Sequence, residues 1–232
     1  MLKDYIQHQQ KQLLEQQTDF YTPTGIHVFF KEPIESENVD TEEVIAQIEA
    51  SIPHHLLSEV EMIIVGWFDE FEDRGLNAFY DGGTLYVSHI QDDNADMIDD
   101  IVHEISHSLE EPHGYFIYGD KKVEEEFIRK RKYLHDMLWK MGYKAPITIF
   151  RDPEYNEKFD MFLYKKIGYS KLADIMKGVF ITPYAATSLR EYFATGFTEF
   201  YLHPDEHKFL KKISPELYKK LIFLHDPEIL DK

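Results

Sequence analysis

Residues 95–111 read ADMIDDIVHEISHSLEE, and this stretch decides the fold. Its apolar residues recur at helical spacing, which predicts a helix from about Ala95 to Glu111 with one face in a core. They are Met97, Ile98, Ile101, Val102, Ile105 and Leu109. His103 and His107 are four residues apart, so their side chains lie on one helix face about one turn apart. Both imidazoles can therefore reach the same ion.

Glu104 completes the pattern H-E-x-x-H. It is rotated by about 100° from His103 around the helix axis, so it would lie beside a metal ion rather than on it. Neutral imidazole is a good zinc ligand. A carboxylate next to a zinc-bound water can accept the proton when that water attacks a carbonyl. The pattern therefore predicts a zinc-dependent hydrolase. The alternative is a chance match on a helix that is simply packed in a core.

A third metal ligand is needed, because catalytic zinc usually has three protein ligands and a water. The chain contains no cysteine, so this ligand must be His, Asp or Glu. Glu191 is a candidate, since it lies in the apolar stretch SLREYFATGF, residues 188–197, where a buried acid needs a partner. Two alternatives are open at this point: Glu191 and Ser188 have the spacing of a helix capping box, and Glu199 lies on the same predicted helix.

The run EYFATGF at residues 191–197, taken with the H-E-x-x-H pattern, resembles the catalytic domain of anthrax-type lethal factor and the Pro-Pro endopeptidases. These are gluzincin metallopeptidases, whose third zinc ligand is a Glu on a later helix. The resemblance implies a zinc site with three protein ligands, which are His103, His107 and Glu191. It implies that Glu104 is the general base and acid. It also implies that Tyr184, seven residues before Glu191, donates to a developing oxyanion. The alternative for Tyr184 is an ordinary surface tyrosine.

The resemblance covers about residues 59–202 and has departures. Thr195 stands where the family has a second Glu, and Ser106 where Gly is frequent. The segment between the two ligand helices is also longer than in those relatives. We therefore expect a helical insertion at residues 112–181, with helices at about 122–141, 153–166 and 169–178. It should flank the cleft and restrict which substrates enter.

The rest of the pattern predicts an α+β fold. Strands are expected at 26–31 and 59–65, and an Asp-Gly turn predicts a hairpin of strands 77–80 and 84–88. A helix is expected at 40–52, and three more at about 187–202, 204–210 and 215–225. We interpret the chain as one zincin-like domain, residues 1–232, with a small twisted mixed sheet and a mostly helical C-terminal half. Residues 1–20 would form an N-terminal helix. Residues 84–88 would be an edge strand that pairs with an extended peptide.

Composition limits the class of partner. The net charge is −18, which argues against nucleic acid because phosphate binding needs clustered Lys and Arg. The charge favours either steering of basic or neutral substrates or plain solubility. No signal peptide or membrane span is recognisable, which predicts a cytoplasmic protein with non-classical export as the other route. The predicted function is a zinc metalloendopeptidase acting on peptides or proteins. The alternatives are a zinc amide hydrolase of a non-peptide substrate and an inactive zincin-fold binding protein.

Overall fold

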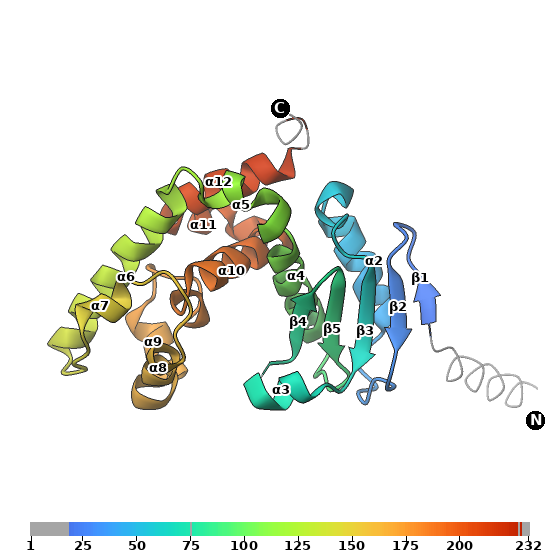
Figure 1. The fold of residues 1–232 in the computed structure, drawn as a ribbon, viewed down its shortest axis with the longest axis horizontal. Helices are drawn as coiled ribbons and strands as arrows, with labels where there is room; N and C mark the ends of the chain where they lie inside the picture. The colour runs from blue at the N-terminus through green and yellow to red at the C-terminus, as the bar shows by residue number, and fades with distance from the viewer. Residues whose placement is uncertain (1–18, 75, 227, 229–232) are drawn as a thin grey trace, which may run out of the picture. The chain divides into compact units, whose positions relative to one another are not determined.

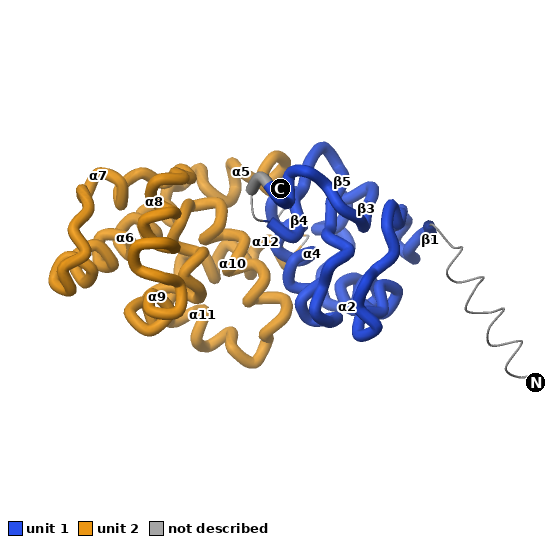
Figure 2. The backbone as a smooth tube through the Cα atoms, turned by 90° about the horizontal axis from the view of Figure 1, so that it is seen from below, with its two compact units in different colours: residues 1–108 blue, residues 109–232 orange. Residues whose placement is uncertain are grey.

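The computed structural model describes residues 19–74, 76–226 and 228 (Figure 1). About 59% of the chain is helical, and five strands form a small mixed sheet, so the predicted α+β class is confirmed. The chain divides into two compact units, residues 1–108 and 109–232 (Figure 2). Most of the N-terminal helix predicted at residues 1–20 lies outside the described residues. Residues 19 and 20 were assigned to that N-terminal helix wrongly, because they lie in a strand.

The first unit is built on the sheet, whose strands are β1 (Asp19–Tyr21), β2 (His27–Phe30), β3 (Met62–Gly66), β4 (Ala78–Asp81) and β5 (Thr84–Ser88). The strand order is β1-β2-β3-β5-β4. The three inner strands are parallel, and β1 and β4 are antiparallel at the two edges. Val28, Ile63 and Leu85 lie in register and are buried, as side chains on one face of a sheet with period two require. This face forms the core of the first unit.

One prediction about the sheet is wrong: residues 84–88 are not an edge strand. β5 pairs with β3 on one side and with β4 on the other, so β4 occupies the edge. The reason is that both Leu85 and Val87 are fully buried, which favours an inner position for β5. The hairpin itself is confirmed, and its turn uses Gly82 and Gly83 at φ of 50° and 86°, where glycine has no steric penalty.

Helices α2 (Thr41–Ser51) and α4 (Asn94–Ser108) pack on each other, and α4 also packs on β4 and β5. A short helix, α3 (Asp69–Arg74), was not predicted. The helix predicted to continue to Glu111 ends three residues early at Ser108, and α5 (Glu110–Tyr118) follows. Pro112, the residue after the predicted end, lies in the first turn of α5, where proline lacks only an N–H that has no helical partner anyway.

The second unit is helical. Its longer helices are α5, α6 (Lys122–Lys140), α10 (Leu189–Leu202) and α12 (Pro215–His225). The shorter ones are α7 (Ile147–Phe150), α8 (Glu157–Met161), α9 (Tyr169–Ile175) and α11 (His207–Ile213). The predictions for α6, α10 and α12 are confirmed to within two residues. The helix predicted from residue 153 begins only at Glu157 and continues as a π-helix, Phe162–Ile167. The predicted insertion contributes α6 to α9 to this unit. No described helix is long and apolar enough to cross a membrane.

Candidate metal centre

The two motif histidines lie on the half-exposed face of α4. Their ring centroids are 5.2 Å apart, with the rings at 74° to each other. On the opposite face Ile101, Val102 and Ile105 are almost completely buried, so the core fixes the rotation of the helix. A helix whose apolar face is anchored in this way directs both imidazoles to one side, as the spacing predicted.

Glu104 is held by the edge strand of the sheet. Its Oε2 accepts a hydrogen bond from the backbone N–H of Tyr80 in β4, at 3.0 Å. The Tyr80 phenol is fixed in turn, because it accepts from the N–H of Gly83 at 3.0 Å and donates to the carbonyl of Glu59 at 3.3 Å. The carboxylate is therefore positioned by the hairpin. Sequence reasoning missed this contact, because the donor is a backbone group.

Asp100 lies one turn before His103 and is half-buried. The amide of Gln91 donates to its Oδ2 at 3.2 Å. Burial raises the pKa of Asp100 to about 7, and the Gln91 hydrogen bond partly opposes this shift. Asp100 is therefore not a freely solvated acid. Its hydrogen-bond partner in the structure is an amide.

Glu191 lies in the first turn of α10. The helix N-cap is Ser188, whose Oγ accepts a hydrogen bond from the backbone N–H of Glu191 at 3.2 Å. This is the backbone half of the capping box that competed with the ligand role. This bond uses the backbone amide of Glu191, so it is compatible with a ligand role for the carboxylate.

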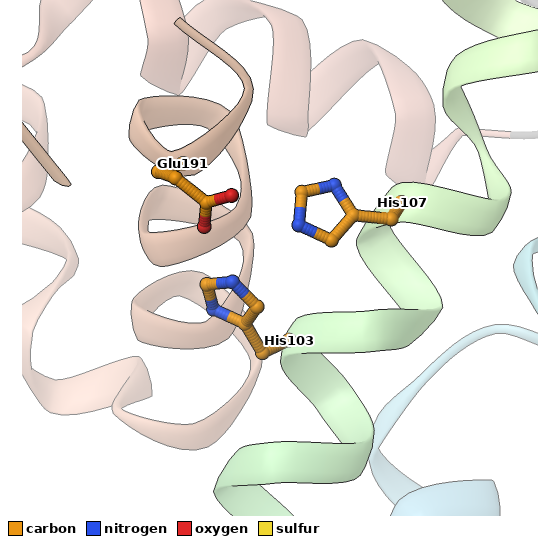
Figure 3. Close-up of side chains that lie close together, drawn as sticks. All are labelled: His103, His107 and Glu191. Atoms are coloured by element: carbon orange, nitrogen blue, oxygen red, sulfur yellow. The ribbon is translucent and has the colours of Figure 1, made fainter. Parts of the chain in front are cut away.

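The structure groups Glu191 with the two histidines. One carboxylate oxygen of Glu191 and one ring nitrogen each of His103 and His107 all lie within 4.8 Å of one another (Figure 3). All three residues are half-buried. Glu199 belongs to no such group, and no second trio of potential ligands occurs in residues 19–74, 76–226 and 228. Two imidazoles and one carboxylate match the donor set of many catalytic zinc sites.

A buried hydrogen-bond network holds α10 within the second unit. Glu126 of α6 is only 1% exposed, and its Oε1 accepts from the phenol of Tyr192 at 2.9 Å. The same carboxylate accepts from the backbone N–H groups of Glu216 at 2.9 Å and Leu217 at 3.3 Å, at the start of α12. Because Tyr192 follows Glu191 directly, these bonds restrict the rotation of the helix that carries the candidate ligand. Sequence reasoning did not identify Glu126.

Tyr184 lies in a 3₁₀ turn, Tyr184–Ala186, that packs on α10. The turn is fixed by Thr187, whose hydroxyl donates to the Tyr184 carbonyl at 2.7 Å. The Tyr184 side chain is half-buried. It lies near Tyr169, whose pKa is raised above its usual range by burial, by its hydrogen bond to Asp160 and by the proximity of Tyr184.

Comparisons with protein-family models, with curated proteins and with solved structures found no match to this chain.

Proposed function

We propose that the protein is a zinc-dependent metallopeptidase with a zincin-like fold. The observation that carries the proposal is the group of His103, His107 and Glu191, whose ligand atoms lie within 4.8 Å of one another. These three residues would hold the ion, and a water would complete the usual four-coordinate set. When bound, zinc would lower the pKa of that water and polarise a substrate carbonyl.

Glu104 is the general base of the proposed reaction. It follows His103 directly and is rotated from it by about 100°, which places a carboxylate beside the ion rather than in its coordination sphere. The Tyr80 N–H donates to Oε2 at 3.0 Å and so positions the carboxylate that would accept a proton from the attacking water. The same carboxylate then returns the proton to the leaving amine.

Tyr184 supplies the oxyanion donor in this proposal. A phenol donates a hydrogen bond to the negative oxygen that develops when a peptide carbonyl becomes tetrahedral. The spacing of seven residues to Glu191 and the packing of its turn on α10 support this role. The substrate would be a peptide or protein rather than nucleic acid, because the chain has a net charge of −18. A cytoplasmic location is part of the same proposal.

The test combines zinc stoichiometry with cleavage of a diverse peptide library. The wild-type chain should bind one zinc ion and cleave peptides. Glu104→Gln should keep the zinc and lose activity by ~10²–10⁴-fold, the usual contribution of general base catalysis. Zinc binding without peptide cleavage would support a hydrolase of another amide or an inactive binding protein. A chain that binds no zinc would refute the proposal.

A further inference from the structure

A cluster of tyrosine rings surrounds one carboxylate in the second unit. Asp160, at the end of α8, accepts a hydrogen bond on each of its oxygens. The phenol of Tyr169 donates to Oδ1 at 2.7 Å and that of Tyr155 donates to Oδ2 at 3.3 Å. The ring of Tyr164 packs edge-on against Tyr169, with centroids 5.3 Å apart. We name Tyr155, Asp160, Tyr164 and Tyr169 the tyrosine cluster.

The tyrosine cluster is linked through the backbone to the segment that carries Tyr184 and Glu191. The cluster and this segment both belong to the second unit. Two residues before Tyr155, the carbonyl of Pro153 accepts a hydrogen bond from the N–H of Leu189 at 2.8 Å. Leu189 is the first residue of α10, which carries Glu191. The cluster, Tyr184 and the ligand helix are thus parts of one packed unit.

The tyrosine cluster is accessible from solvent. Tyr155 is 54% exposed and Tyr164 is 50% exposed, although tyrosine rings contribute more stability when buried. Tyr164 lies in the π-helix Phe162–Ile167. Such π-helical turns are rare and occur frequently at functional sites. Folding alone does not account for two exposed tyrosine rings, one of them on a π-helix, in the unit that also contains Tyr184. These rings are therefore candidates for a binding role.

We propose that the tyrosine cluster is a subsite for a cationic side chain, Lys or Arg, of a peptide substrate. An ionised carboxylate has about four lone-pair positions, so Asp160 can accept further hydrogen bonds after those from Tyr155 and Tyr169. The faces of tyrosine rings also attract cations. An anionic side chain would be repelled by the carboxylate. A purely apolar one would remove water from Asp160 without replacing its hydrogen bonds.

A lysine of the chain itself already uses one of these rings. The Nζ of Lys165 lies 4.5 Å from the centroid of the Tyr164 ring. Lys165 follows Tyr164 directly in the chain, and this contact makes its ammonium group a competitor for an incoming cation. The net charge of −18 on the whole chain also favours the approach of basic peptides.

The subsite rests on the proposed function, because its ligand would be a peptide substrate. It is tested by peptide binding without cleavage, so that the two proposals can fail separately. Two fluorescein-labelled decapeptide pools, random at nine positions, carry Lys or norleucine at the fifth; norleucine has the same carbon chain without the ammonium group. Both are titrated into the full chain treated with EDTA, which prevents cleavage. We expect the Lys pool to bind about tenfold more tightly, as a charged hydrogen bond and a cation–π contact predict.

Three variants test whether the Lys preference depends on Asp160 and Lys165. Asp160→Asn should reduce the Lys preference to about one. Lys165→Met, an exposed change, should increase it, because a competing cation is removed. Asp174→Asn on α9 removes the same charge from an exposed position and should leave the preference unchanged. If Asp160→Asn lowers the melting temperature, its binding result cannot be separated from misfolding. The increase in Lys preference expected for Lys165→Met then decides whether the subsite exists.

Equal binding of the two pools to the wild-type chain, or a preference that survives Asp160→Asn in a folded protein, would overturn the subsite. Zinc binding and cleavage are measured separately. A chain that prefers Lys but binds no zinc would keep the subsite and refute the metallopeptidase. A chain that cleaves peptides without preferring Lys would keep the metallopeptidase and refute the subsite.

Discussion

Replacement of Glu191 by Gln tests the proposed metal centre most directly. The backbone N–H of residue 191 would still donate to Ser188 Oγ, so the start of α10 keeps its cap. The loss of an acid from the first helical turn costs only ~0.3–1 kcal/mol of stability. Changes to groups that merely orient a zinc ligand typically weaken metal binding by ~10–100-fold. Loss of a ligand should therefore weaken zinc binding at least ~100-fold, or about 2.7 kcal/mol.

Glu199 provides the matched control on the same helix. It lies eight residues from Glu191, which is about 12 Å along the axis and about 80° around it. Glu199→Gln should therefore leave zinc affinity unchanged. Zinc is titrated into both apo variants in competition with a chromophoric chelator, and circular dichroism verifies that α10 is intact. If Glu199→Gln loses zinc and Glu191→Gln keeps it, the assignment of the third ligand is wrong and the role of Tyr184 fails with it.

Two further predictions concern the second unit. Tyr184→Phe should lower kcat by roughly 10²-fold with little change in KM, because an oxyanion donor acts mainly in the transition state; an unchanged kcat would leave Tyr184 a packing residue. Lys130 is buried, and burial lowers its pKa to about 7. Between pH 7 and pH 10.5 the unfolded chain therefore binds one more proton than the folded chain, so the free energy of unfolding should rise with pH. Urea unfolding at several pH values should show this slope in the wild type and a smaller one in Lys130→Met.

The sequence predicted those elements whose hydrophobic pattern is long enough to show a period. α4, α6 and α10 each have 14 residues or more and were found. β1 has three residues and α7 has four, too few for any periodicity to be visible. The order of strands was not predictable in the same way, because it depends on which strands pair across the sheet. This is why β5 was expected at the edge that β4 occupies.

In the candidate site, geometry fixed within one helix could be predicted, and contacts between distant segments could not. His103 and His107 could be paired from spacing alone, because one helix determines their geometry. The contact of Glu104 with the Tyr80 N–H could not, since the donor is a backbone group brought near by strand packing. The bond between Glu126 and Tyr192 joins residues 66 positions apart in the chain. A buried acid gives no sign in the sequence of which distant donor it will meet.

The insertion between the two ligand helices also supports one of them. Arg131 of α6 is fully buried, and its guanidinium donates to the carbonyls of Ile149 and Asp152, both at 2.6 Å. The next carbonyl along the chain, that of Pro153, accepts from the N–H of Leu189 at the start of α10. The insertion therefore braces the segment from which Glu191 projects. Because the brace depends on buried hydrogen bonds of a charged group, its removal would leave carbonyls unpaired inside the unit. The extra helices are thus part of what positions the candidate ligand.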